Sequence, residues 1–228
     1  MPSQVLALRP ELEDAPADAR QHLEALALAP GDIVLDDAQC LALLCGGDPD
    51  AAAAVFLAAF GSLPEVLGAG AGDLVRVAGR AAAVRLRLVR ELARRMLVRP
   101  LRARPVLSGS QAVSDYLRTT LTGAPREQVR VLFLDRRHHL IGDELLNEGT
   151  VDHAPVYPRE VMRRALELHA SAVLIVHNHP AQDPTPSAAD VDMTRQIVEA
   201  GRALRIVVHD HMIVAGQQVV SLKTLGLM

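Results

Sequence analysis

One uninterrupted apolar run, AVLIV at residues 172–176, constrains the fold of this chain more than any other feature. Its length and its branched residues predict a short buried strand. The run leads directly into His-Asn-His-Pro, in which Pro180 stops the strand and sets the direction of exit. We therefore expect a buried strand that carries two histidines at its end.

The rest of the chain after Pro105 alternates between the patterns of strands and helices. Branched and apolar residues predict strands at 129–134, 139–146, 206–214 and 217–222. Helical spacing of apolar residues predicts helices at 114–121, 158–169 and 187–204. This alternation indicates a mixed α/β domain in which at least two helices pack against a sheet.

The part of the chain before Pro105 has a different character. Residues 1–35 are acidic and contain several prolines, which predicts a tail or a loosely docked helix. Residues 36–104 have helical periodicity interrupted by glycines and predict four or five short helices. Eight arginines and a single acidic residue, Glu91, lie between 85 and 104, and Pro100 and Pro105 then break the pattern. We predict three parts: an acidic tail (1–35), a helical domain with an arginine-rich linker (36–104) and an α/β domain (105–228).

Composition and charge limit the functions that this chain can have. A formal net charge of −3 over 228 residues argues against a protein that binds polyanions by charge alone. Five aromatic residues, with no tryptophan, offer little surface for stacking on single-stranded bases. The N-terminus has no signal-peptide pattern, and the apolar stretch near 51–60 is too short to span a membrane. We expect a cytoplasmic protein without a membrane partner.

The histidines after the apolar run predict a metal site. Alternate side chains of an extended chain point the same way, so His177 and His179 should project together. A loop over 181–186 then returns the chain to a helix that starts near Ser187 and carries Asp190 in its first turn. Two imidazoles and a carboxylate suit Zn²⁺ and leave a fourth position for water, so we predict one zinc per chain. Ser187 and Asp190 also fit a capping box, which needs no metal.

A second pair, His209 and His211, has the same spacing but a different context. It is followed by more strand, and no acidic residue on a returning helix accompanies it. We therefore expect these two side chains to form hydrogen bonds in or beside the core.

The residues of the predicted metal site and the segments around them resemble a known family. His177-x-His179, seven residues, and then Ser187-x-x-Asp190 resemble the JAMM motif of JAB/MPN-domain metalloproteases. Together with this motif, six ordered segments between about 105 and 222 resemble the RadC family of bacterial JAB proteins: VLFLD (131–135), EGT (148–150), VYPRE (156–160), HNHP (177–180), DPTPS (183–187) and DH (210–211). The resemblance implies a JAB-type mixed sheet with flanking helices, one Zn²⁺ and metallopeptidase activity, and it brings the label of a DNA repair protein.

The resemblance also implies roles for single residues. It makes His177, His179 and Asp190 the zinc ligands and places Ser187 beside the zinc, where it would help to stabilise an oxyanion. The glutamate of the motif corresponds to Glu127, which precedes the strand at 129–134 and would act as general base. An ordinary solvated carboxylate at a strand end is the alternative for Glu127, and Glu144 and Glu148 are the other candidate bases.

The N-terminal half resembles RadC as well, with two departures along the chain. FGSL at 60–63 resembles the FGSL segment of the family, and LVRVAG at 74–79 resembles the entry to its helix-hairpin-helix. That hairpin needs a second glycine two residues on, and this chain has Ala81 there, whose Cβ disfavours the positive φ that glycine permits. Beside the metal motif, Ala181-Gln182 stands where the family commonly has Ser-Gly. The first departure argues against phosphate binding, and the second alters a loop but no ligand.

Two functions follow from these patterns. The first is a zinc-dependent hydrolase that cleaves an amide bond of an unidentified peptide or isopeptide substrate. The second is a DNA-associated accessory protein in which the arginines of 85–104 contact phosphates and the zinc is structural or vestigial. We favour the first and expect DNA binding to be weak or absent, since a solvated helix face explains the arginines equally well. No pattern in the sequence indicates an oligomeric state.

Overall fold

The computed structural model describes residues 17–106, 111–149 and 156–228. The chain forms two compact units, Met1–Glu91 and Leu92–Met228. The division falls inside the long helix α6 (Ala71–Ala103), before the boundary expected near Pro105. Pro100 lies within this helix and does not end it, although proline has no N–H to donate to the carbonyl four residues earlier. Residues 1–16 of the predicted acidic tail, together with Thr150 and His153, lie outside the described residues.

The first unit consists of helices, as the periodicity predicts. They are α1 (Ala17–Leu28), α2 (Asp37–Cys45), α3 (Pro49–Ala52), the π-helical turn η1 (Ala53–Leu57), α4 (Ala58–Phe60), α5 (Leu63–Gly68) and the first part of α6. Asp36 begins α2 with a capping box that involves Gln39, and Asp48 caps α3. A common apolar core that includes Leu41, Phe56 and Leu86 holds the helices together.

Gly79 interrupts α6 within this unit. Its φ of 79° and ψ of 170° are not helical, so two helical stretches meet at a kink. Glycine adopts a positive φ without the steric penalty that a Cβ brings. Ala81, which stands at the position of the second hairpin glycine, is already part of the following helix.

Among the described residues, no single helix has both the length and the apolar character needed to cross a membrane. Asp37–Cys45 and Pro49–Phe60 pass that test only as a pair, which is bent by 97°.

The second unit is built on a five-stranded mixed sheet. Its strands are β1 (Gln128–Leu134), β2 (Leu140–Glu148), β3 (Ala172–Asn178), β4 (Val207–Ala215) and β5 (Gln218–Ser221), in the order β2-β1-β3-β4-β5. The central strand β3 pairs antiparallel with β1 and parallel with β4. All seven residues of β3 are buried. The strand runs two residues further than the apolar run predicts, because both neighbours continue to pair with it through His177 or Asn178.

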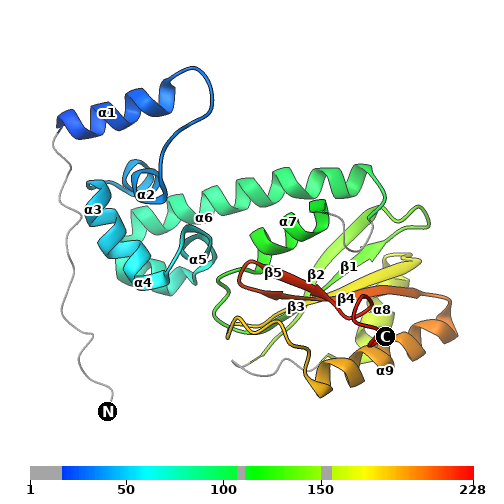
Figure 1. Ribbon diagram of the computed structural model, residues 1–228. Coiled ribbons are helices and arrows are strands. Elements are labelled where there is room, and N and C mark those ends of the chain that lie inside the picture. The colour runs from blue at the N-terminus through cyan, green and yellow to red at the C-terminus, as the bar shows by residue number, and fades with distance from the viewer. Residues whose placement is uncertain (1–16, 107–110, 150–155) are drawn as a thin grey trace, which may run out of the picture. The chain divides into compact units, whose positions relative to one another are not determined.

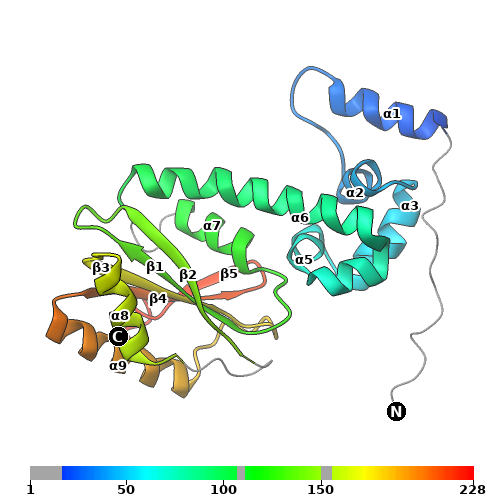
Figure 2. The ribbon, with the colours of Figure 1, turned by 180° about the vertical axis from the view of Figure 1, so that it is seen from behind.

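Helices cover both faces of this sheet (Figure 1). The end of α6 and α7 (Gln111–Leu121) pack on one face, where Tyr116 and Leu117 are fully buried. On the other face lie α8 (Pro158–Glu167) and α9 (Ala188–Leu204), which contact each other (Figure 2). The mixed sheet with flanking helices agrees with the predicted JAB-type α/β fold.

The connection from α9 to β4 predicts a sensitive position at Gly201. A Cβ there would lie 2.5 Å from the carbonyl oxygen of Ile206, a backbone atom that cannot move aside cheaply. We expect Gly201→Ala to lower the free energy of unfolding of the second unit by about 1–3 kcal/mol, as overpacking typically does. Glu199→Ala, an exposed substitution in the same helix, should change it by less than about 0.5 kcal/mol. Urea unfolding measures both, and equal stability of the two variants would contradict the packing.

Candidate metal centre

The two histidines lie at the end of β3 and directly after it. His177 is fully buried and pairs with Val129 of β1 and Ile213 of β4. The backbone N–H of His179 donates to the carbonyl of Val214 at 2.9 Å, which holds the chain beside β4 after the strand has ended. The Nε2 atoms of the two imidazoles lie 2.8 Å apart, so the rings converge as alternation along an extended chain predicts.

Asp190 approaches the same point from the first turn of α9. Ser187 caps this helix, and its hydroxyl oxygen accepts the N–H of Asp190 at 3.1 Å. The Asp190 carboxylate in turn accepts the N–H of Ser187 at 2.7 Å and its hydroxyl at 2.6 Å. The predicted capping box is therefore present, and it does not exclude the metal site, because it aims the carboxylate at the histidines.

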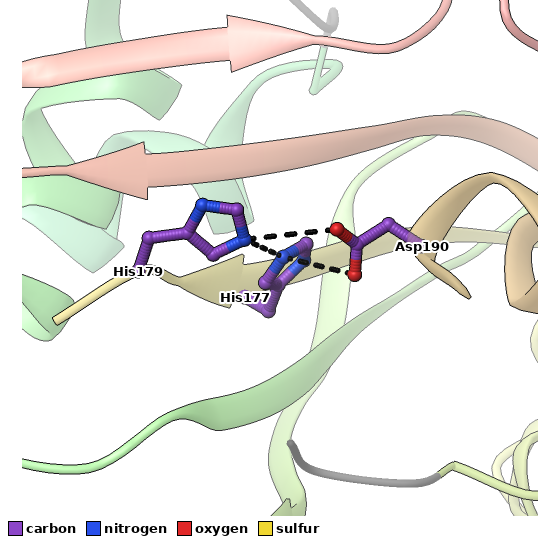
Figure 3. A group of neighbouring side chains, drawn as sticks. All are labelled: His177, His179 and Asp190. Atoms are coloured by element: carbon purple, nitrogen blue, oxygen red, sulfur yellow. Dashed lines mark hydrogen bonds and ion pairs between the residues drawn. The ribbon is translucent and has the colours of Figure 1, made fainter. Parts of the chain in front are cut away.

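The three side chains form one cluster (Figure 3). Asp190 Oδ1 lies 3.3 Å from His177 Nε2, and Oδ2 lies 3.7 Å from His179 Nε2. One ligand atom from each residue can be chosen so that all lie within 4.8 Å of one another. The residues come from a strand, a loop and a helix that are joined only through the fold.

Burial and charge prepare these groups to bind a cation. Burial lowers the pKa of His177 to about 4, although the nearby Asp190 opposes this shift. The hydrogen bond with Asp190 raises the pKa of His179, whose ring is only half buried. Burial would raise the pKa of Asp190, but the contacts with His179, His177 and Ser187 outweigh it and hold that pKa well below its usual value. At neutral pH His177 is therefore neutral and Asp190 ionised, the forms that ligate metals.

The loop after His179 supplies a partner for its ring. Nδ1 of His179 lies 2.6 Å from the backbone oxygen of Asp183, which can only accept, so Nδ1 carries the proton. In the neutral ring Nε2 then offers a lone pair to the cluster. Gln182 has a φ of 61° in this loop, a conformation that glycine adopts more easily.

The donor set fits zinc. Two imidazole nitrogens and one carboxylate oxygen are typical ligands of Zn²⁺ in sites that keep one position open. The second ring nitrogen of each histidine is already hydrogen bonded, His177 Nδ1 to His211 at 2.7 Å and His179 Nδ1 to Asp183. Such bonds orient metal-ligating histidines and fix their tautomers.

Comparison with known protein families agrees with this geometry. The model of the RadC-like JAB domain matches residues 107–227, more than half of the chain. The chain belongs to the RadC family of JAB-domain proteins. The match contains the whole sheet and every residue of the cluster.

The fold of this RadC-family protein places Glu127 where its charge acts on His179 of the cluster. Glu127 precedes β1, the neighbour of β3, and only 9% of its surface is exposed. Its charge contributes to the raised pKa of His179. The side chain of Asn178 holds the backbone on either side of Glu127: Nδ2 donates to the carbonyl of Arg126 at 3.1 Å, and Oδ1 accepts the N–H of Gln128 at 2.9 Å.

The other two candidate bases have different surroundings. Both oxygens of Glu144 accept hydrogen bonds from Arg164 at 2.6 Å, so this carboxylate is held in a two-pronged ion pair on β2. Glu148 is exposed and pairs across the sheet with Gln128. Of the three carboxylates, the charge of Glu127 is the one that acts on His179.

The two histidines of the second pair have different surroundings. His211 is fully buried and forms hydrogen bonds, as expected, with His177 and Thr194. His209 instead packs edge-on against His138, and burial lowers its pKa. Sequence reasoning missed the parts played by Asn178, Asp183 and Thr194. Of these three, only Asn178 had a local signal in the sequence, which is its position between His177 and His179.

These contacts predict the metal content of the protein. We expect about one zinc per chain in the wild type, by elemental analysis after dialysis. His177→Ala and His179→Ala should each abolish it with the fold retained, because the sheet keeps its own apolar core. Asp190→Asn should weaken binding, since it removes a charged ligand. His22→Ala, which removes an exposed histidine from the first unit, should keep full zinc content. Wild-type protein without metal would contradict the assignment.

Proposed function

We propose that this RadC-family protein is a JAMM-type zinc metallopeptidase or isopeptidase. The observation that carries the proposal is the convergence of His177, His179 and Asp190 within 4.8 Å in a JAB domain. Three protein ligands leave one tetrahedral position for water or substrate, as in catalytic zinc sites and unlike closed structural ones. The proposed substrate is an amide bond of a peptide or of an isopeptide linkage.

A zinc ion at the cluster would lower the pKa of a coordinated water and polarise the amide carbonyl. The residues of the chain then have two tasks, proton transfer and stabilisation of the developing negative charge. Glu127 takes the proton from the attacking water and gives it to the leaving amine. Support for this role comes from its burial and from its charge effect on His179.

Ser187 serves the second task. Its hydroxyl lies beside the cluster, 2.6 Å from Asp190 Oδ2. Rotation about its Cα–Cβ bond would let the hydroxyl donate to the oxyanion of the substrate instead. The backbone N–H of Ser187 bonds to Asp190 at 2.7 Å independently of this rotation, so the carboxylate keeps its orientation.

Glu127 provides the test of the enzymatic proposal. Glu127→Gln keeps the shape of the side chain and removes its basicity, so zinc content and Tm should remain those of the wild type. Hydrolysis of a mixture of fluorogenic peptides and isopeptide-linked peptides should fall by at least about 100-fold, as loss of a general base typically causes. Glu148→Gln, an exposed carboxylate near the same sheet edge, is the matched control and should retain activity.

The possible outcomes separate the parts of the proposal. Full activity in Glu127→Gln would exclude this residue as the base. Loss of activity in Glu148→Gln alone would transfer the role to that residue. A zinc-loaded wild type that hydrolyses none of these peptides would contradict the peptidase proposal and favour a structural or vestigial zinc.

The alternative is a DNA-associated protein, and the arginines between 85 and 104 are the observation that favours it. Several of them are engaged within the protein. Arg85 donates to the carbonyl of Leu44 at 3.2 Å, Arg90 to that of Gly68 at 3.0 Å, and Arg94 lies 3.4 Å from the hydroxyl of Tyr116. These contacts occupy N–H donors that would otherwise be available to phosphates.

We therefore expect at most weak, sequence-independent DNA binding. Fluorescence anisotropy with a labelled duplex at physiological salt should give a Kd no tighter than the roughly 10⁻⁴–10⁻⁶ M of non-specific binding. Changing both Arg80 and Arg85 to Ala should change this Kd little. A sub-micromolar affinity that is lost in this double variant would support the DNA-associated alternative.

A further inference from the structure

A chain of buried hydrogen bonds runs from α9 to the metal cluster. The hydroxyl of Thr194 lies 2.5 Å from the backbone oxygen of Asp190 and 2.5 Å from Nδ1 of His211. His211 Nε2 lies 2.7 Å from His177 Nδ1, and His177 Nε2 faces His179 and Asp190. Thr194, His211 and His177 are all fully buried, so water does not compete for these bonds.

Each proton in this series of hydrogen bonds has one favourable donor atom. The carbonyl of Asp190 can only accept, so the single hydroxyl proton of Thr194 goes to it. The hydroxyl oxygen must then accept a proton from His211 Nδ1. A neutral His211 that is protonated at Nδ1 has a lone pair at Nε2, and that lone pair accepts the Nδ1 proton of His177.

The last step concerns the ligand atom. A neutral His177 with its proton on Nδ1 has its lone pair on Nε2, the atom that faces the cluster. The neutral form of His211 follows from its complete burial, because a buried imidazolium without a hydrogen-bonded carboxylate is costly. Within the described residues, the hydrogen bonds of the His211 ring are those to His177 and Thr194.

An irregularity in β4 puts His211 in this position. Val173 pairs with Val208, but Leu174 pairs with Asp210, so His209 is an extra residue in the parallel ladder. Side chains alternate along a strand, and one inserted residue shifts every later side chain to the opposite face. His211 therefore shares a face with Val208.

Asp210 stabilises the irregular segment. Its Oδ1 accepts the N–H of His211 at 2.8 Å and that of Lys223 at 3.1 Å, and its Oδ2 accepts the hydroxyl of Ser221 at 2.6 Å. These bonds tie the bulge to the last residue of β5 and to the segment that follows it.

We propose that Thr194 and His211 are positioning residues that fix the tautomer and the orientation of His177 and thereby set the affinity of the site for zinc. This inference rests on the zinc part of the proposed function and is independent of peptidase activity. Partners that bond to the second nitrogen of a ligating histidine typically contribute about 10–100-fold to metal affinity.

The test compares two buried threonines in the full-length chain. Thr194→Val removes the hydroxyl with little change in volume, and Thr194→Ser restores it. Thr120→Val is the matched control, because the Thr120 hydroxyl is also buried and donates to the backbone four residues earlier, to Tyr116 at 2.7 Å. Zinc affinity is measured at fixed pH by competition with a chromophoric chelator.

We expect Thr194→Val to weaken zinc binding by about 10–100-fold, with Thr194→Ser and Thr120→Val within about threefold of the wild type. Wild-type affinity in Thr194→Val would overturn the proposal. A wild type that binds no zinc would instead refute the metal centre itself.

A measurement on the wild type covers the case in which Thr194→Val does not fold. Imidazole ¹⁵N NMR of the zinc-loaded protein reports which ring nitrogens carry protons. We expect protonated Nδ1 on both His177 and His211, with Nε2 of His211 unprotonated. A protonated Nε2 on His211 would reverse donor and acceptor in the hydrogen bonds of His211 and contradict the proposed role.

Discussion

The burial of two polar side chains at the end of the central strand is the constraint on which the rest of the site depends. β3 is covered on both faces, yet His177 and Asn178 occupy its last two positions. Buried polar groups that lack hydrogen bonds are costly, so each of these side chains needs partners supplied by the fold. His177 finds His211 on the parallel neighbour β4, and Asn178 finds the backbone around Glu127 beside the antiparallel neighbour β1.

Satisfying these groups assembles the parts of the candidate metal site. The partner of Asn178 is the segment that carries Glu127, so the bonds that satisfy the buried amide also fix the backbone on either side of this carboxylate, whose charge contributes to the raised pKa of His179. The capping box of α9 works in a similar way, because it satisfies the free N–H groups of the helix start and directs Asp190 to both histidines. The hydrogen bonds that cap α9 therefore also orient Asp190, and those that satisfy Asn178 at the buried end of β3 also fix the backbone around Glu127.

Much of this could be predicted from local patterns. The apolar run of β3, the spacing from His177 to Asp190 and the capping signal at Ser187 depend on neighbours a few residues away. The predicted helices and strands of the second unit are present with modest shifts at their ends. The boundary expected at the prolines differs from the division inside α6, because the helix continues through Pro100 and the two compact units divide after Glu91.

The sequence by itself determined which residues offer ligand atoms and which of them follow a strand or start a helix, because backbone periodicity and capping are local. Only the tertiary structure decided which further residues surround the ligands. The pairing of β1 with β3 places Glu127 where its charge acts on His179, and the bulge at His209 turns His211 toward His177. Strand order and register arise from contacts between residues far apart in the chain, and a shift of one residue reverses the face of every side chain that follows.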